Sequence, residues 1–234
     1  MKGRRVIKVS PSIIASKNYK NDESLTETLA KIEKAGANFV HLDVMDGKFV
    51  SNTTFDHTFV EKVAQKTNLI LDVHLMVENP DSEIDRYVKA GADIISVHYE
   101  ACKDLVSTLR KIKSRNVIAG VVINPETSVL KIKDIIEARI ADLVLVMSVK
   151  PGASGQPFQP VAYEKIIEIR EYSKKILIEV DGGVCPKNAG QLTKYGANIL
   201  VSGSCVFNSP DMKKTIDQLK GKTFANKLKS FFNK

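Results

Sequence analysis

Apolar runs recur along the chain at intervals of about 25 residues, and each is followed by a stretch in which apolar residues return every three or four positions. The runs are rich in Val, Ile and Leu without polar alternation, which is typical of parallel strands covered on both faces. The stretches between them have the spacing of amphipathic helices. The pattern therefore predicts eight strands, over Val6–Ser10, Phe39–Val44, Ile70–Met76, Ile94–His98, Ile118–Ile123, Leu143–Ser148, Ile176–Val180 and Ile199–Ser202.

Several helix ends can be placed from the residues between these runs. Ser24, with Glu27 three residues later, predicts an N-cap and a capping box for the first helix. Gly36, Gly91 and Gly196 each follow a helical stretch in the phrase Ala-Gly-Ala or Tyr-Gly-Ala. A glycine in this position commonly ends a helix, so each helix should stop before the next apolar run.

Eight strand–helix units in strict alternation favour an α/β fold of the (β/α)8 TIM-barrel class, with an open doubly wound sheet as the alternative. No linker, low-complexity tract or block of like charge marks a boundary, so we expect a single barrel domain over 1–234. The last residues, about 221–234, continue past the eighth helix. There Phe224, Leu228, Phe231 and Phe232 fall at helical spacing among lysines, which predicts a basic amphipathic tail that packs on the barrel or on a neighbouring subunit.

Composition narrows the class of protein. No run of about 18 apolar residues predicts a membrane span, and the N-terminus lacks the apolar stretch of a secretory signal. Three widely spaced cysteines, an odd number, indicate reduced thiols and a cytoplasmic protein. The net charge of +8 is spread among 27 acidic residues, and the chain has no Trp. We therefore expect no nucleic-acid or membrane partner, and the positive balance suits a small anionic substrate such as a sugar phosphate.

Polar residues of metal-ligating type stand near the carboxyl ends of three predicted strands. His41 and Asp43 are two apart in the second strand, His74 lies in the third, and Asp181 follows the seventh. Residues two apart in a strand share a face, and the carboxyl ends of barrel strands meet at one end of the barrel. Imidazole nitrogen and carboxylate oxygen are suitable ligands for a divalent metal. The sequence therefore predicts a metal or catalytic cluster of two histidines and two aspartates.

Other residues of the predicted strands need a separate interpretation. Asp72 shares a face with His74 but would lie about 7 Å deeper, so we interpret it as a structural partner of the cluster. His98, at the end of the fourth strand, is interpreted as a hydrogen-bonded core residue. Met45, Met76 and Met147 would each be ordinary core filler if they stood alone.

Glycine-rich turns follow the last three predicted strands. They are Pro151–Gln156, Gly182–Gly183 and Gly203–Ser204. Glycine allows backbone N–H groups to approach an anion closely, and phosphate sites after strands seven and eight are frequent in such barrels. Together the three turns predict a phosphate-binding site.

Six short segments stand in order at the strand ends, namely Pro11–Ser16, His41–Val50, Asp72–Val77, Met147–Gly152, Val180–Val184 and Gly203–Ser204. This ordered set, which extends from about Val9 to Phe207, resembles the ribulose-phosphate 3-epimerase family. Ordered motifs over nearly the whole barrel are far more specific than a single glycine loop. The resemblance implies a barrel of the ribulose-phosphate-binding type.

The resemblance also implies a reaction, the interconversion of D-ribulose 5-phosphate and D-xylulose 5-phosphate in the pentose phosphate pathway. The proton at C3 is transferred through an enediolate, with Asp43 and Asp181 as the acid/base pair on opposite faces. One divalent ion per subunit, Zn²⁺ or Fe²⁺ with Mn²⁺ or Co²⁺ as alternatives, stabilises the enediolate as a Lewis acid. Its implied ligands are His41, Asp43, His74 and Asp181.

Substrate contacts follow from the same resemblance. Ser12, His74 and Asp181 would contact the sugar, and a dry wall of Met45, Met76 and Met147 would face the enediolate. The family also implies a homo-oligomer, either a dimer or a hexamer. The phosphate would be surrounded by the turns after strands six, seven and eight, at Gly152, Ala153, Ser154, Gly155, Gly182, Gly183, Gly203 and Ser204.

One turn departs from the family pattern. The family usually has Pro-Gly-Phe-Gly-Gly-Gln after strand six, whereas Pro151–Gln156 has Ala153 and Ser154 in place of Phe and Gly. A D-allulose-6-phosphate 3-epimerase, which acts on the six-carbon homologue, is therefore the alternative. Related decarboxylases and aldolases carry Asp-x-Lys-x-x-Asp at strand three, and the absence of lysine from Asp72–Val77 disfavours them. A non-catalytic sugar-phosphate binding protein is a more distant alternative, because it would not need both carboxylates.

Overall fold

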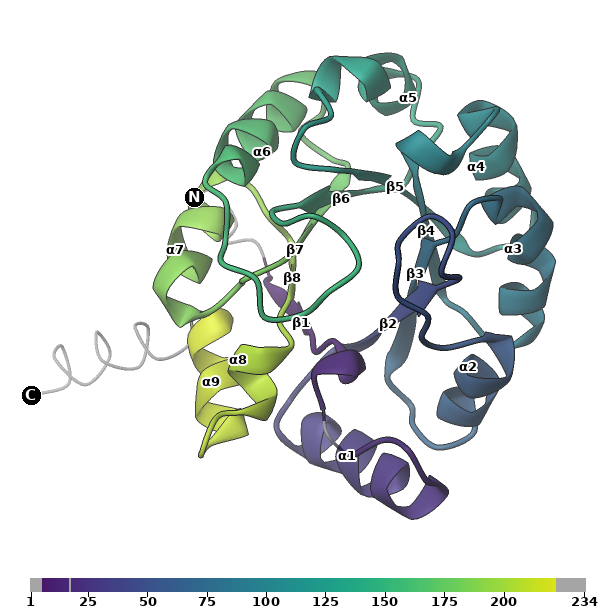
Figure 1. The fold of residues 1–234 in the computed structure, drawn as a ribbon. Helices are drawn as coiled ribbons and strands as arrows, with labels where there is room; N and C mark the ends of the chain where they lie inside the picture. Colours follow the sequence, from purple (N-terminus) through teal and green to yellow (C-terminus); the bar gives the residue numbers. More distant parts are fainter. Residues whose placement is uncertain (1–5, 17, 222–234) are drawn as a thin grey trace, which may run out of the picture.

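The computed structural model describes residues 6–16 and 18–221, and it has the predicted (β/α)8 architecture. The sheet is parallel and runs in the order β1-β8-β7-β6-β5-β4-β3-β2, with helices around its outside (Figure 1). Between β1 and β2, His41 donates its backbone N–H to Pro11 at 3.0 Å and pairs with Ser12. The strands are β1 (Lys8–Ser10), β2 (Phe39–Met45), β3 (Ile70–Met76), β4 (Ile94–His98), β5 (Ile118–Ile123), β6 (Leu143–Met147), β7 (Leu177–Asp181) and β8 (Ile199–Val201).

All eight predicted strands are present, and their bounds differ from the prediction by two residues or fewer. The outer α-helices are α1 (Asp22–Lys34), α2 (His57–Ala64), α3 (Pro80–Lys89), α4 (Leu105–Ser114), α5 (Lys133–Glu137), α6 (Val161–Tyr172), α7 (Pro186–Tyr195), α8 (Ser204–Phe207) and α9 (Met212–Leu219). Short 3₁₀ helices, η1 (Ile13–Ala15), η2 (Tyr99–Ala101) and η3 (Val129–Ile132), precede α1, α4 and α5. None of the described helices is long and apolar enough to cross a membrane.

The observed helix ends agree in part with those predicted from the sequence. Gly36, Gly91 and Gly196 follow α1, α3 and α7 with positive φ, as predicted. The predicted N-cap at Ser24 is wrong, because α1 begins two residues earlier and Asn21 is its N-cap. The Asn21 side chain accepts the Ser24 backbone N–H at 2.9 Å, so Ser24 lies inside the first turn. Asn and Ser are both good N-caps, and the sequence alone does not choose between them.

Alternation along the strands separates two apolar layers. Val40, Leu42 and Val44 of β2 belong to the large core between the sheet and the helices, whereas Phe39 belongs to a smaller cluster inside the barrel. Because successive side chains point to opposite faces, His41 and Asp43 share the inner face with Phe39. The outer core therefore fixes which side chains of β2 point into the barrel.

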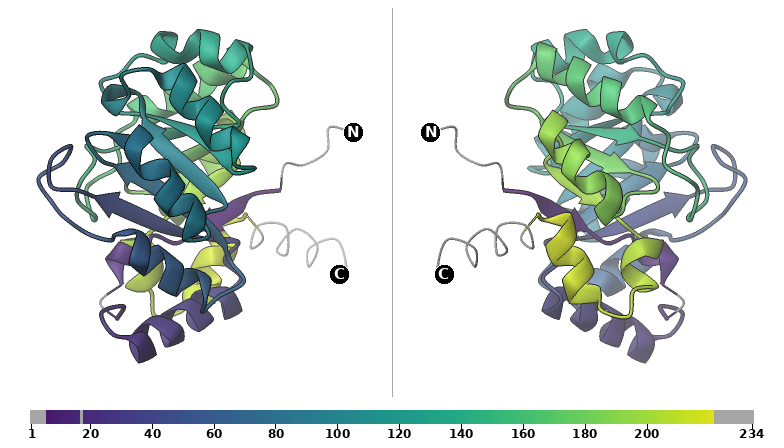
Figure 2. Two further views of the ribbon diagram at one scale, coloured as in Figure 1. Left: turned by 90° about the vertical axis from the view of Figure 1, so that its right-hand side faces the viewer. Right: turned by 90° about the vertical axis from the view of Figure 1, so that its left-hand side faces the viewer.

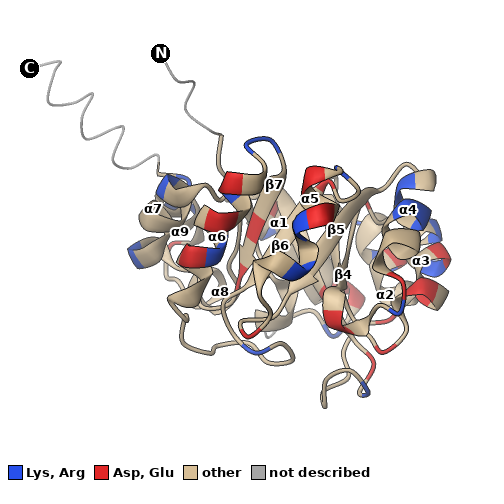
Figure 3. Cartoon of the chain, turned by 90° about the horizontal axis from the view of Figure 1, so that it is seen from above, with Lys and Arg blue, Asp and Glu red and all other residues tan. Residues whose placement is uncertain are grey.

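The loops after β2 and β6 project at one end of the barrel, and β1 begins at the other (Figure 2). Lys and Arg are interspersed with Asp and Glu over the outer helices, as Figure 3 shows. The prediction of a single domain over 1–234 remains a prediction. The predicted amphipathic tail at 221–234 lies, apart from Gly221, outside the described residues.

Candidate metal centre and phosphate loops

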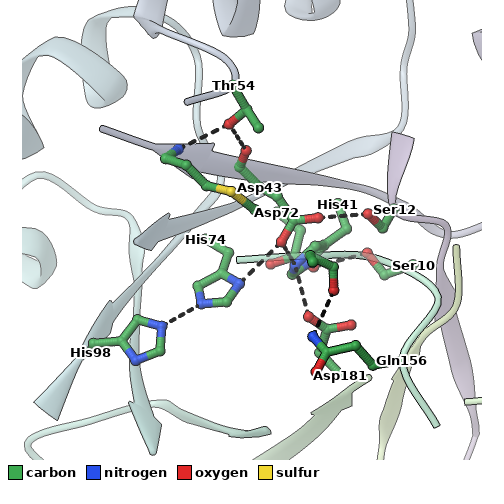
Figure 4. A network of polar contacts seen from close by, with 12 residues as sticks. Ser10, Ser12, His41, Asp43, Thr54, Asp72, His74, His98, Gln156 and Asp181 are labelled. Atoms are coloured by element: carbon green, nitrogen blue, oxygen red, sulfur yellow. Dashed lines mark hydrogen bonds and ion pairs between the residues drawn. The ribbon is translucent and has the colours of Figure 1, made fainter. Parts of the chain in front are cut away.

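The four predicted metal ligands come together inside the barrel, at the carboxyl ends of β2, β3 and β7 (Figure 4). The register between β2 and β3 places Asp43 beside His74. Leu42, Val73 and Val180 pack in the outer core, so their strand neighbours point inward. Register and alternation thus bring together four residues that lie far apart in the sequence.

The geometry of this cluster suits a divalent metal. Asp43 Oδ1 lies 3.4 Å from His41 Nε2 and 3.3 Å from His74 Nδ1, and Asp181 Oδ2 lies 3.9 Å from His41 Nε2. The candidate ligand atoms all lie within 4.8 Å of one another. His41 Nε2 and His74 Nδ1 are buried and have no hydrogen-bond partner. Two unpaired nitrogen atoms facing two carboxylates match a nitrogen–oxygen metal site, because a bound cation would satisfy all four groups.

Electrostatic interactions shift the pKa values of the two aspartates of the cluster in opposite directions. Burial raises the pKa of Asp181 and the charge of Asp43 raises it further, to about 7. Burial has the same tendency at Asp43, but the charge of His41 and the close approach of both histidines outweigh it and lower the Asp43 pKa. Near neutral pH Asp43 is therefore ionised, whereas Asp181 is close to its midpoint.

The two histidines also differ. Burial lowers the pKa of His74, and the nearby Asp43 carboxylate only partly offsets this effect. Burial opposes protonation of His41 as well, but the charges of Asp72 and Asp43 outweigh it and raise the His41 pKa well above its usual value. The two carboxylates thus favour the charged form of the His41 imidazole in the metal-free protein.

A deeper layer of polar residues supports His41. Asp72 is buried and its Oδ2 accepts hydrogen bonds from His41 Nδ1 at 2.7 Å and from the Ser10 hydroxyl at 2.8 Å. Asp72 thus has the position expected of a structural partner. Glu179, one layer below Asp181, is also buried, and burial together with the charge of Asp72 raises its pKa well above the usual value. Glu179 was not among the predicted site residues, although its spacing of two from Asp181 could have revealed it.

Other predicted residues surround a cleft of about 570 Å³ above the cluster. The Ser12 hydroxyl donates to Asp43 Oδ2 at 2.6 Å. Thr54, which the sequence analysis also missed, accepts the Met45 N–H and donates to the Asp43 carbonyl, and so holds the end of β2 (Figure 4). The three predicted methionines, Met45, Met76 and Met147, line the cleft together with Ser12, Asp43 and Asp181.

The glycine-rich turns after β6, β7 and β8 also line the cleft. Gly183 has φ +58°, and a Cβ there would lie 2.5 Å from the backbone N of Phe158. Only glycine therefore allows these two backbone segments to approach so closely. The turn after β6 is tied to the loop after β2, since Asn52 donates to the Gly152 carbonyl at 2.6 Å. The predicted phosphate residues that line the cleft are Gly152, Ala153, Ser154, Gly155, Gly182, Gly183, Gly203 and Ser204.

The fold and the site together define a (β/α)8-barrel protein with a candidate metal centre at the carboxyl ends of its strands. Residues 8–207 match the model of the ribulose-phosphate 3-epimerase family. The chain belongs to this family. Its fold is shared with a mutant tryptophan synthase alpha-subunit from Pyrococcus furiosus (TM-score 0.68, 15% identity, 93% of this chain and 99% of that one).

Curated relatives agree with the family match. Ribulose-phosphate 3-epimerase of Bacillus subtilis (strain 168) is 45% identical over 221 residues, which cover 92% of this chain and 99% of that protein. The chloroplastic ribulose-5-phosphate-3-epimerase of Arabidopsis thaliana is 42% identical over 218 residues, with coverage of 91% and 75%. A Synechocystis ribulose-phosphate 3-epimerase is 40% identical over 216 residues, with coverage of 90% and 91%.

Proposed function

We propose that this chain is a metal-dependent ribulose-phosphate 3-epimerase, which interconverts D-ribulose 5-phosphate and D-xylulose 5-phosphate by proton transfer at C3. The observation that carries the proposal is the meeting of Asp43 and Asp181 with two unpaired histidine nitrogens beneath a cleft with a glycine-rich wall. Family membership and curated relatives at 40–45% identity support the same activity. A non-catalytic binder has no need for this arrangement of acids and ligands.

Each group has a distinct part in the mechanism. Inversion at a carbon requires removal of a proton from one face and its return to the other, and the two aspartates supply these functions. Asp43 is ionised and held by the Ser12 hydroxyl, so it can accept a proton. Burial and the neighbouring Asp43 raise the pKa of Asp181 to about 7 in the metal-free site, which favours Asp181 as the group that holds the proton. The reverse reaction exchanges the two roles.

Removal of the proton from C3 also requires that the negative charge left on the sugar be stabilised. A divalent ion, which His41, Asp43, His74 and Asp181 would hold, supplies Lewis-acid stabilisation of the negative charge that develops on the sugar oxygens. Zn²⁺ or Fe²⁺ suits this ligand set, with Mn²⁺ or Co²⁺ as alternatives. The buried methionines Met45, Met76 and Met147 exclude water from that face of the sugar.

The turns after β6, β7 and β8 would bind the phosphate through backbone N–H groups, and the exposed Lys150 on the same cleft adds a positive charge. A D-allulose-6-phosphate 3-epimerase remains the second candidate, because Ala153 and Ser154 both line the cleft where the family usually has Phe and Gly. The smaller Ala153 leaves more space in this turn. A dimer or hexamer and a cytoplasmic location stay predictions.

Proton NMR in D2O tests the proposal directly. D-ribulose 5-phosphate and D-allulose 6-phosphate are each incubated with the protein, with and without a chelator, and deuterium at C3 is followed. Faster exchange in the five-carbon sugar, with formation of xylulose 5-phosphate and loss of activity on chelation, is the expected result. Preference for the six-carbon sugar would support the second candidate, and no exchange with metal present would refute both.

A preparation of Asp181→Asn serves as the matched control in this experiment. It passes through the same purification, so any exchange it shows measures epimerase carried over from the expression host. Only exchange above that level counts as activity of this chain.

A further inference from the structure

A second line of polar contacts leads away from the candidate metal centre through His98 and Glu100. His98 ends β4 and is fully buried. Its Nε2 lies 2.9 Å from His74 Nε2, and the two rings stack with their centroids 5.0 Å apart (Figure 4). On the other side of the ring, His98 Nδ1 lies 3.2 Å from Glu100 Oε2. Glu100, His98 and His74 thus form a chain that ends at the candidate centre.

The position of the proton on His74 decides which group donates and which accepts in each of these hydrogen bonds. His74 Nδ1 is the ring nitrogen that faces Asp43 and has no hydrogen-bond partner. A ring nitrogen must be unprotonated to bind a metal, so the proton of a neutral His74 has to be on Nε2. His74 Nε2 then donates to His98 Nε2, which requires the His98 proton to be on Nδ1. His98 in turn donates to Glu100.

Glu100 is held in place as an acceptor by the loop after β5. Its Oε1 accepts the Asn124 backbone N–H at 3.0 Å and the Thr127 hydroxyl. Lys165 of α6, which is buried, donates to the carbonyl oxygens of these two residues. Burial opposes ionisation, but hydrogen bonds to His98 and the loop outweigh it and lower the Glu100 pKa to about 2. An ionised carboxylate has no proton to donate, so it can only accept from His98.

The two histidines of this hydrogen-bonded chain are also protected from water. Phe49, in the loop after β2, lies against His98 with ring centroids 4.7 Å apart, and neither His74 nor His98 is exposed. His98 Nε2 is therefore the acceptor that the structure offers to His74 Nε2. His41 has an equivalent acceptor in Asp72, so both histidines of the centre have a carboxylate behind them, directly for His41 and through His98 for His74.

We propose that His98 and Glu100 are positioning residues that hold His74 in the tautomer whose Nδ1 is free to bind the metal. The inference rests on the proposed function, because it takes His74 as a ligand. Acceptors behind a ligating histidine fix its tautomer and raise its basicity, and their loss commonly lowers metal affinity about 10–100-fold. Glu100→Gln should have an effect of this size, because its amide can donate to His98 Nδ1 and reverse both hydrogen bonds.

The test uses the full chain labelled with ¹⁵N-histidine. The protein has four histidines, His41, His57, His74 and His98, so its long-range ¹H–¹⁵N spectra are simple. The variant His57→Gln identifies the signals of His57, which lies away from the candidate centre. Spectra are recorded with and without Zn²⁺ to locate the proton on each ring. Co²⁺ affinity is measured separately by visible absorption for the wild type, Glu100→Gln and the control Glu78→Gln, which removes the same charge at an exposed position after β3.

The expected result is a proton on Nδ1 of His98 and on Nε2 of His74, with Co²⁺ affinity about 10–100-fold lower in Glu100→Gln and nearly unchanged in Glu78→Gln. A proton on Nε2 of His98, or equal Co²⁺ affinity in wild type and Glu100→Gln, would overturn the inference. The proton on His98 is read without metal as well, so the measurement remains decisive if Glu100→Gln does not fold. A wild type that binds Co²⁺ with the expected tautomers but does not epimerise would refute the proposed function and leave the inference intact.

Discussion

Replacement of Asp181 by Asn should have opposite effects on activity and on the stability of the metal-free protein. Asp181 is the group whose pKa is raised to about 7, first by burial and then by repulsion from Asp43. The neutral amide removes that repulsion while it keeps nearly the same shape. It also removes an acid/base group, so epimerisation should fall by about 10²–10⁴-fold.

The stability effect follows from the proton balance. Between the unfolded pKa of 3.8 and the folded value of about 7, the folded state binds more protons than the unfolded state. The free energy of unfolding of the metal-free wild type therefore falls as the pH rises through this range. From pH 5 to pH 8 the folded and unfolded states differ by nearly one proton over about two pH units, which gives a loss of up to about 3 kcal/mol at 1.36 kcal/mol per pKa unit. The Asp181 side chain is 18% exposed, which reduces the expected loss to about 2 kcal/mol.

Urea denaturation of metal-free wild type and Asp181→Asn at pH 5 and pH 8 measures this difference. From pH 5 to pH 8 the free energy of unfolding of the variant should rise by about 2 kcal/mol relative to that of the wild type. This change does not depend on the difference in stability between the two proteins at pH 5. A parallel NMR assay of the metal-loaded proteins measures the activity. The reasoning would be refuted by a variant that keeps wild-type activity, or by a wild type whose stability relative to the variant does not depend on pH.

Three further changes test other parts of the site. His74→Ala should contain clearly less than one metal ion per chain in elemental analysis, and full occupancy would exclude His74 as a ligand. Gly183→Ala should raise KM for the sugar phosphate about tenfold with little change in kcat. The positive φ alone costs about 1–2 kcal/mol, and the new Cβ would lie 2.5 Å from the Phe158 N. An unchanged KM would contradict this prediction. Zn²⁺ binding should release protons from His41 and Asp181 and weaken as the pH falls, because ligating imidazole and carboxylate groups must be deprotonated. Calorimetry in buffers of different ionisation enthalpy measures this release, and a value of zero would contradict the raised pKa of His41.

The strands could be predicted because each is an apolar run of nearly constant spacing. Their bounds are set by where the outer core begins and ends, and that core consists of the residues that made the pattern visible, such as Leu42 and Val73. Helix starts were harder. Asn21 and Ser24 have nearly equal cap preference, so the choice depends on how the preceding loop reaches α1.

The four candidate ligands could be found because strand alternation fixes their face and the barrel fixes their end. Glu100 and Thr54 were missed because their roles depend on how loops fold over the ends of the strands. His98 was expected to be a hydrogen-bonded core residue, and it is one. Its link to Glu100 depends on how the β5 loop folds over the end of β4, and no sequence spacing encodes that contact. Thr54 likewise returns to β2 through a loop whose path the sequence does not specify.

The arrangement around the centre is unfavourable for folding without a cation. Two carboxylates repel each other, and His41 Nε2 and His74 Nδ1 are buried without partners. Each unpaired buried group costs about 1–3 kcal/mol, so a hydrophobic replacement would make a more stable barrel. The hydrogen bonds of Asp72 and Glu100 hold the two rings so that these same nitrogens face one point. The cost is therefore concentrated in the four groups that a metal would satisfy, which is the pattern expected of a site built for binding and chemistry and not for stability.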